Sequence, residues 1–158
     1  MKAKALALAL AASWPPLAGA QDADALTGDA AAGADLFSRQ CVSCHVVANE
    51  AGEALAGRGA RVGPNLYGVA GRTPGSVEGF RYSPSMRAYG ETGAAWDEAG
   101  FVPYVMDPTG FLREALADPR ARGKMAYNVR DEQDAHDLWA YLASVASRDG
   151  APEGSPGE

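Results

Sequence analysis

The chain has 158 residues, with 14 lysines and arginines against 20 aspartates and glutamates, which gives a formal net charge of −6. So acidic a protein is a poor candidate for binding nucleic acid, because that binding needs a cationic face that releases counterions from phosphates. Its length fits one ordinary domain.

The first twenty residues, "MKAKALALALAASWPPLAGA", have the order of a secretory signal peptide. Lys2 and Lys4 form a positive start, residues 5–12 an apolar run, and "AGA" at residues 18–20 a small-residue cleavage site. The run is far shorter than the roughly 20 residues needed to span a bilayer. We expect residues 1–20 to be removed and the mature protein, with 12 basic and 20 acidic residues (−8), to be soluble and periplasmic.

Helical patterns occur at both ends of the mature chain. "GDAAAGADLFSRQ" predicts a helix that is capped by Asp29 and runs to Cys41. "DPTGFLREALADP" predicts another, with Asp107 as its cap, a proline at its first position and a second proline, Pro119, closing it. A short apolar piece, residues 101–106, precedes it. A last helix starts at Asp131, where acidic residues fill the first turn.

The segment from Val46 to Tyr89 holds much of the glycine and shows no convincing helix or strand. An irregular connection that long is uncommon in a compact domain. It becomes reasonable if the segment wraps a large apolar ligand that serves as part of the core. We expect one domain over residues 21–147, with no strands, followed by a disordered acidic tail, residues 148–158, that is rich in glycine and proline.

Both cysteines and one of the two histidines lie within "QCVSCH", residues 40–45. Zinc needs about four ligands, and Cys41, Cys44, His45 and the distant His136 are a poor set. A thioredoxin-like redox pair expects a preceding strand, whereas a helix precedes this motif. Cys-x-x-Cys-His after a helix is typical of haem attachment, in which the two thiols bond to the haem vinyl groups and the histidine binds the iron. We therefore predict a covalently bound haem with His45 as an axial ligand.

The second axial ligand is open from spacing alone. Three methionines remain after the leader, Met86, Met106 and Met125, and each is more often a core gap-filler than a ligand. Met125 lies in the loop "ARGKMAYNV", which can fold over the face opposite His45. His136 is the rival ligand, but its acidic neighbours on the last predicted helix favour a solvated surface histidine.

The sequence resembles the class I cytochromes c, most of all the bacterial cytochrome c2 branch of soluble electron carriers. The resemblance runs from residue 29 to about 145 and depends on five landmarks in order: "CVSCH", "GPNLYGVAGR", "AWDEAGFVPYVMDPTGFL", "RGKM" and "DAHDLWAYL". It implies an all-α class I cytochrome c fold, in which helices and long loops wrap one covalent haem c and the terminal helices cross. Gly33 is expected to allow that crossing under Leu138 and Tyr141.

The resemblance also implies roles for single residues. It makes Met125 the second axial ligand and the carbonyl of Pro64 the acceptor for the far ring nitrogen of His45. It places Tyr104 near the methionine ligand and assigns donors to the haem propionates at Arg72, Tyr82 and Trp96. From the residues alone, Tyr82 and Trp96 would equally be core aromatics and Pro64 a turn proline.

The predicted function is one-electron transfer between membrane complexes, from a quinol:cytochrome c oxidoreductase to a reaction centre or terminal oxidase, by a monomer that docks transiently. No catalytic dyad or triad is evident. The alternatives are a small haem enzyme, a gas-binding cytochrome with a displaceable sixth ligand, or a dedicated donor to one periplasmic reductase.

The partner surface is the point where the chain departs from its family. The resemblance implies a ring of lysines around the haem edge, yet only Lys124 remains beyond the leader. We hypothesise that a cationic cluster replaces it, the alternative being scattered solvated charges. The cluster comprises Arg58, Arg61, Arg113, Arg120, Arg122, Lys124 and Arg130.

Overall fold

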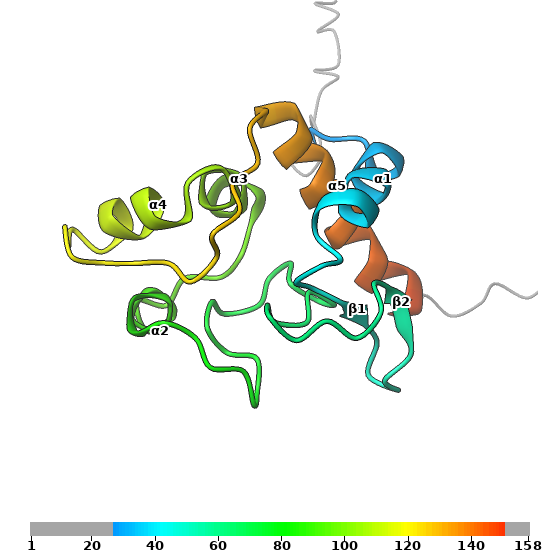
Figure 1. The fold of residues 1–158 in the computed structure, drawn as a ribbon, viewed down its shortest axis with the longest axis horizontal. Helices are drawn as coiled ribbons and strands as arrows, with labels where there is room; N and C mark the ends of the chain where they lie inside the picture. The colour runs from blue at the N-terminus through cyan, green and yellow to red at the C-terminus, as the bar shows by residue number, and fades with distance from the viewer. Residues whose placement is uncertain (1–26, 151–158) are drawn as a thin grey trace, which may run out of the picture.

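The computed structural model describes residues 27–150, and the predicted leader and residues 151–158 of the predicted tail lie outside them. Over this range the chain forms five helices and one small sheet, in agreement with the predicted mainly helical fold (Figure 1). The elements are α1 (Ala30–Gln40), β1 (Val47–Ala48), β2 (Ala54–Ala56), α2 (Pro84–Glu91), α3 (Glu98–Met106), α4 (Pro108–Ala115) and α5 (Glu132–Gly150). Among these residues no helix is both long and apolar enough to cross a membrane.

The first and last helices cross closely, as the resemblance implies. Gly33 makes the crossing possible, because a Cβ there would lie 1.9 Å from the backbone oxygen of Asp137 and 2.9 Å from the Cβ of Tyr141. Next to it, the rings of Phe37 and Tyr141 pack with centroids 5.6 Å apart. Figure 1 shows α1 lying across α5 at one end of the molecule.

Side-chain caps fix where the helices begin. The two predicted caps are confirmed, since carboxylate oxygens of Asp29 and Asp107 accept backbone N–H groups at the starts of α1 and α4. Asp131, the predicted start of the last helix, accepts from the N–H of Gln133 in the same way. Asp97 caps α3 in the same way, accepting from the N–H of Gly100 at 2.8 Å, so this helix begins three residues before the expected apolar piece. The ends are less well predicted, since α4 ends at residue 115, before Pro119, and α5 includes residues 148–150, which were assigned to the tail.

The prediction that residues 46–89 contain no helix or strand was wrong. The side chain of Asn49 accepts from the N–H of Glu53 at 2.9 Å, and Gly52 adopts φ +81° between them, so β1 and β2 form a short hairpin. Ser83 caps α2 by accepting from the N–H of Met86 at 3.1 Å. The strands, of two and three residues, are too short to show an alternating pattern. The Ser-Pro start of α2 was a signal present in the sequence.

Candidate functional site

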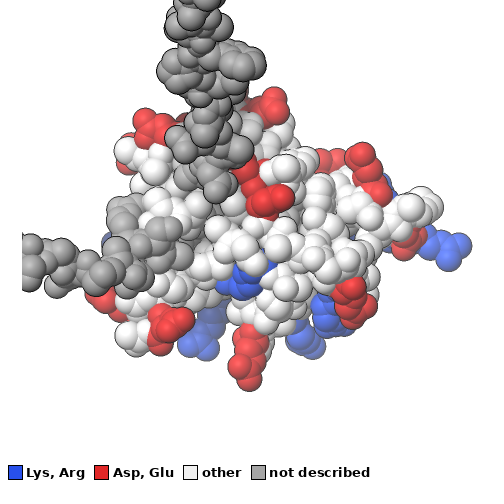
Figure 2. Space-filling model, turned by 180° about the vertical axis from the view of Figure 1, so that it is seen from behind, with Lys and Arg blue, Asp and Glu red and all other residues white. Residues whose placement is uncertain are grey.

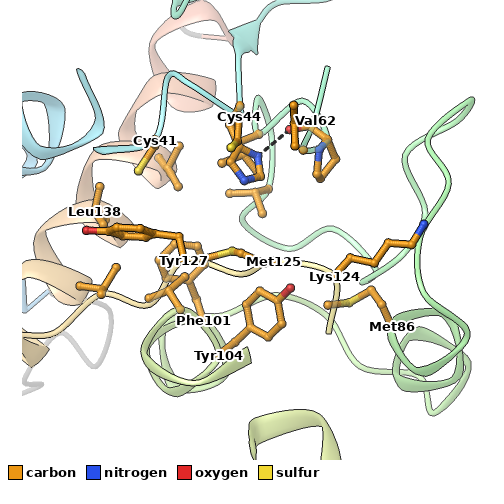
Figure 3. Close-up of a pocket in the computed structure, with 18 of the residues that line it drawn as sticks. Cys41, Cys44, Val62, Met86, Phe101, Tyr104, Lys124, Met125, Tyr127 and Leu138 are labelled. Carbon is orange, nitrogen blue, oxygen red and sulfur yellow. Dashed lines mark hydrogen bonds between the residues drawn. The ribbon is translucent and has the colours of Figure 1, made fainter. Parts of the chain in front are cut away.

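A cavity of about 470 Å³ lies within the fold, and residues from most parts of the described chain line it. The turn after α1, the irregular segment, α2, α3, α5 and the connection from α4 to α5 all line it (Figure 3). We call that connection, residues 116–131, the Met125 loop. All nine predicted site residues line the cavity: Cys41, Cys44, His45, Pro64, Arg72, Tyr82, Trp96, Tyr104 and Met125.

The predicted attachment motif forms a single turn that continues α1. The N–H groups of Cys44 and His45 both donate to the carbonyl of Cys41, at 3.0 and 2.8 Å. No disulfide joins Cys41 to Cys44. Burial raises the pKa of the Cys41 thiol to about 11, and the nearby Cys44 adds to the rise. A redox-active pair needs a lowered thiol pKa, so this turn does not resemble a thioredoxin-like site.

The ring of His45 is held by one hydrogen bond. Its Nδ1 lies 2.9 Å from the carbonyl oxygen of Pro64, which can only accept, so Nδ1 carries the proton and Nε2 is left for a metal (Figure 3). Burial lowers the pKa of His45 and the bond to Pro64 opposes that shift, the net direction being downward. A neutral imidazole with one free nitrogen is the form that binds metals.

Gly63 was missed as a site residue, although it stands first in the landmark "GPNLYGVAGR". A Cβ at this position would lie 2.3, 2.5 and 2.6 Å from Cε1, Nδ1 and Nε2 of His45. Its N–H also donates to the carbonyl of Cys44 at 2.7 Å. The imidazole therefore packs flat on the glycine, which leaves no room for any side chain. Gly63 precedes Pro64, so the two residues that fix the ring are adjacent in sequence.

Polar donors enter the cavity from the irregular segment. Arg72 donates from its two terminal nitrogens to the carbonyls of Tyr67 and Asn65, at 2.7 and 3.0 Å. Burial raises the pKa of Tyr82, and the charge of Arg72 opposes that rise. The cavity is largely apolar. A guanidinium and a phenol in such a cavity suit a ligand that is apolar over most of its area and carries carboxylates, because a buried carboxylate needs hydrogen-bond donors.

Trp96 is a core aromatic, which was one of the two roles considered for it, and it also reaches the cavity wall. It lines the cavity, yet only 7% of it is exposed, and its ring packs on Tyr89, Tyr104 and Phe111. Its backbone N–H donates to the carbonyl of Arg72 at 2.9 Å, which fixes the arginine segment against α3 and its cap. The aromatic cluster and the cavity wall are therefore continuous.

The three methionines differ in their position relative to the cavity. Met106 packs on the core outside the cavity, whereas Met86 and Met125 both line it. In Figure 3 the Met125 side chain extends into the middle of the cavity, and Met86 lies at its edge beside Lys124. Tyr104 points its hydroxyl into the same space, and burial raises the pKa of Tyr104 to about 12, so the phenol stays protonated.

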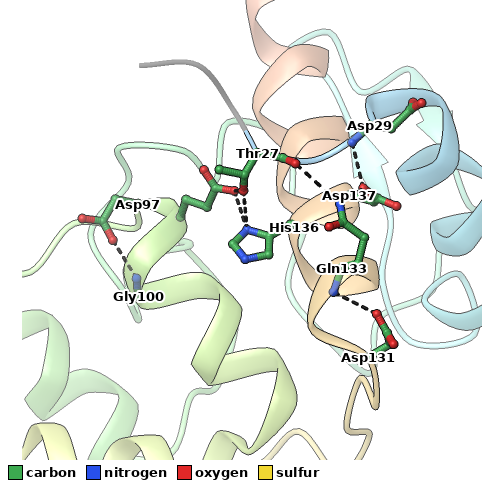
Figure 4. A network of polar contacts seen from close by, with 9 residues as sticks. Thr27, Asp29, Asp97, Gly100, Asp131, Gln133, His136 and Asp137 are labelled. Atoms are coloured by element: carbon green, nitrogen blue, oxygen red, sulfur yellow. Dashed lines mark hydrogen bonds and ion pairs between the residues drawn. The ribbon is translucent and has the colours of Figure 1, made fainter. Parts of the chain in front are cut away.

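His136 lies at the surface, as predicted, but it is only partly solvated. Its side chain is 25% exposed, and Nδ1 lies 2.6 Å from both Oε1 of Glu98 and Oγ1 of Thr27 (Figure 4). The sequence pattern missed this because both partners are distant in the chain and meet the histidine where α1, α3 and α5 begin. His136 does not line the cavity.

The donor groups of the cavity suit a haem. Within residues 27–150, no group of three His, Cys, Asp or Glu side chains converges as a site for a bare metal ion. The cavity instead offers two thiols, one imidazole with a free nitrogen, and thioethers from the opposite side. These are the groups that attach and ligate a haem in cytochromes c.

Comparisons with known proteins agree with this chemistry. The family described as "Cytochrome c" matches residues 30–146. Cytochrome c2 of Rhodovulum adriaticum is 58% identical over 120 residues, covering 76% of this chain and 94% of that protein. Cytochrome c2 of Cereibacter sphaeroides is 48% identical over 149 residues, covering 94% of this chain and 99% of that protein.

Solved structures give the same relationship in three dimensions. Cytochrome c2 from Rhodobacter sphaeroides superposes with a TM-score of 0.73 at 51% identity, covering 75% of this chain and 97% of that one. Ferric cytochrome c-550 from Paracoccus versutus superposes with a TM-score of 0.70 at 38% identity, covering 75% of this chain and 98% of that one. The chain therefore belongs to the cytochrome c family, as a class I electron carrier most like the bacterial cytochromes c2, and holds one covalently attached haem c.

Proposed function

We propose that the protein is a periplasmic one-electron carrier with His45 and Met125 as the two axial ligands of its haem. It takes electrons from a quinol:cytochrome c oxidoreductase and delivers them to a reaction centre or a terminal oxidase. The observation that carries this proposal is that the imidazole of His45 and the thioether of Met125, 80 positions apart in sequence, line one cavity that also holds both thiols.

Each residue has a task that its geometry supports. Cys41 and Cys44 supply the thiols that form the two thioether bonds, and Pro64 fixes the tautomer of His45. Arg72, Tyr82 and Trp96 serve as donors to the propionates. The bound haem supplies a ferric–ferrous couple, and two protein ligands leave the iron no open position for a substrate.

We further propose that the protein acts as a monomer and that residues 1–20 export it. Docking is transient, through the cationic cluster defined above. All seven of its residues are exposed, and one of them, Lys124, also lines the cavity. On the face shown in Figure 2, acidic side chains are widespread, whereas lysines and arginines gather on its lower part and at one edge.

The first test is the ligand pair. Ferric protein should show the weak near-infrared charge-transfer band of sulfur-to-iron ligation. Met125→Leu should abolish the band and let ferrous protein bind carbon monoxide, because leucine has no donor atom. Met106→Leu is the matched control and should keep the band, since Met106 packs outside the cavity.

Met86→Leu tests whether Met86, and not Met125, is the sulfur ligand, because Met86 also lines the cavity. Loss of the band in Met86→Leu with retention in Met125→Leu would replace Met125 by Met86 as the ligand. Wild-type ferrous protein that binds carbon monoxide at neutral pH would instead favour a gas-binding cytochrome or a small haem enzyme.

A further inference from the structure

The cavity has two walls that come from different parts of the chain. We call the last turn of α1, the turn that follows it and the segment 62–66 the histidine wall, and α2, α3 and the loop before α2 the distal wall. A series of hydrogen bonds joins the Met125 loop to the distal wall and to α4, which packs against α2 and α3. These run from Arg122 N to Ser85 Oγ (3.0 Å), Gly123 N to Thr109 Oγ1 (3.2 Å), Lys124 Nζ to Arg81 O (2.5 Å), Asn128 Nδ2 to Met106 O (2.7 Å) and Val129 N to Val105 O (2.9 Å).

One hydrogen bond of the loop reaches the histidine wall instead. The hydroxyl of Tyr127 donates to Oε1 of Gln40 at 2.6 Å. Among the bonds described for residues 116–131, it is the one that crosses the cavity to the histidine wall. Gln40 directly precedes Cys41, and Tyr127 is two residues beyond Met125.

The two residues of this bond lie at the mouth of the cavity. Both line it, and Tyr127 is 45% exposed although it is a large aromatic residue. In Figure 3 the Tyr127 side chain lies between Cys41 above and Phe101 below, with its hydroxyl on the side of Leu138. The ring thus reaches both the cavity and the surface, and its hydroxyl joins the loop to the residue beside the first attachment cysteine.

We propose that the Tyr127–Gln40 bond is a latch that holds the Met125 loop closed over the haem and makes the sixth ligand hard to displace. This inference rests on Met125 being that ligand. Tyr127 and Gln40 are then positioning residues, because they act on the iron only through the path of the loop. An external ligand binds only after the loop opens, so its apparent affinity scales with the population of the open form.

The latch is one hydrogen bond between neutral groups near the surface, so it stabilises the closed form modestly. Tyr127→Phe removes the donor but keeps the ring. We expect ferric Tyr127→Phe to bind imidazole about two- to tenfold more tightly than wild type, measured by spectrophotometric titration. Gln40→Leu should give the same gain. The double variant should gain no more than either single one, because all three lack the same bond.

Two further variants separate a latch from a general loss of structure. Gln40→Glu keeps an acceptor oxygen and should leave imidazole affinity near that of wild type. Tyr89→Phe removes a phenolic hydroxyl from a residue outside the cavity wall and should also bind imidazole as wild type does. Guanidinium unfolding of each variant should show that the gain in affinity does not follow global stability.

The outcomes distinguish the latch from the ligand assignment. A wild-type protein that shows the sulfur-to-iron band, with Tyr127→Phe and Gln40→Leu binding imidazole no more tightly, overturns the latch alone. A wild-type protein without the band overturns Met125 as the ligand, and the latch with it. Equal gains in Tyr127→Phe and Tyr89→Phe also overturn the latch, since the effect would then be unrelated to the cavity mouth.

Discussion

The position of the His45 ring depends on a residue that has no side chain. Gly63 lies against the ring, while the carbonyl of the next residue, Pro64, accepts the Nδ1 proton at 2.9 Å. The ring is therefore fixed by contact on one side and by a hydrogen bond at its edge. An added methyl group has nowhere to go, because the atoms within 2.3–2.6 Å of it are those of the ring itself.

Gly63→Ala should therefore displace the imidazole and weaken its bond to Pro64. We expect the free energy of unfolding to fall by about 2 kcal/mol, the usual cost of forcing extra volume into a packed site. The absorption spectrum and midpoint potential of the haem should change as well, because the histidine ligand has been reoriented. Guanidinium unfolding and a redox titration measure both effects.

Gly68→Ala is the control for this variant. Gly68 has φ +64°, so alanine costs about 1 kcal/mol in backbone strain, yet nothing lies within 4 Å of the added Cβ. It should lose stability without a change in the haem spectrum. If both variants keep the wild-type spectrum, the contact with Gly63 does not position the ligand.

At the scale of secondary structure, the starts of α1, α3 and α5 meet in one polar junction. Thr27, Glu98 and His136 come from these three regions, and Oγ1 of Thr27 donates to Oε1 of Glu98 at 2.5 Å (Figure 4). Asp137 adds a second link, accepting from the backbone N–H of Asp29 at 2.7 Å. Burial by itself would raise the pKa of Glu98, but the hydrogen bonds from Thr27 and His136 outweigh it, so this pKa lies below its ordinary value.

A lowered pKa makes the contribution of Glu98 depend on pH in a definite direction. The ionised carboxylate stabilises the fold above the ordinary glutamate pKa, and this stabilisation is lost as the pH falls through the lower folded-state pKa. Glu98→Gln should therefore cost about 1 kcal/mol of unfolding free energy at pH 7, a modest value for a partly exposed charged hydrogen bond. The difference from wild type should shrink in acid, as measured by guanidinium unfolding at several pH values.

Glu91→Gln provides the comparison, since it makes the same chemical change at an exposed position on α2. Its free energy of unfolding should stay close to that of wild type at every pH tested. A cost for Glu98→Gln that stays constant into acid would show that side-chain shape, and not charge, holds the junction.

At the scale of the whole molecule, charge is unevenly placed. The acidic caps Asp29, Asp97 and Asp131 stand where three helices begin, and carboxylates are stabilised there by the helix dipoles. The residues of the proposed cationic cluster lie on the Met125 loop, α4 and the irregular segment, although α4 itself begins at a fourth acidic cap, Asp107. A molecule with negative net charge can thus present a positive region to an acidic partner, and its dipole can steer the encounter.

Changing both Arg120 and Arg122 to Glu should slow second-order oxidation by the partner about three- to tenfold at low salt. The matching change of both to Gln removes half as much charge and should have a smaller effect. The wild-type rate should itself fall as ionic strength rises from 10 to 100 mM, as the Debye length shortens from about 30 to 10 Å. Stopped-flow kinetics measure these rates. A wild-type rate that rises with salt would mean that like-charge repulsion dominates the encounter.

Local chemistry is the part of this protein that its sequence determined. The thiols, the ligand histidine and the preceding helix lie within sixteen consecutive residues, from Ala30 to His45, and their covalent spacing alone indicates a haem. The caps Asp29, Asp107 and Asp131 are equally local, because each bonds to backbone N–H groups two or three residues ahead. The five ordered landmarks indicated the family, and the family resemblance implied the fold. The short hairpin and α2 escaped because their hydrophobic patterns are too brief to be periodic.

Only the tertiary structure decided which distant residues meet. Spacing left three methionines open, and the fold places Met86 and Met125 in the cavity and Met106 outside it. It also brought Tyr127 to Gln40 across 87 positions and His136 to Glu98 across 38. The physical reason is that these contacts depend on how helices pack and loops close. A short sequence pattern encodes backbone propensity and local spacing, but not the path by which remote segments return to one another.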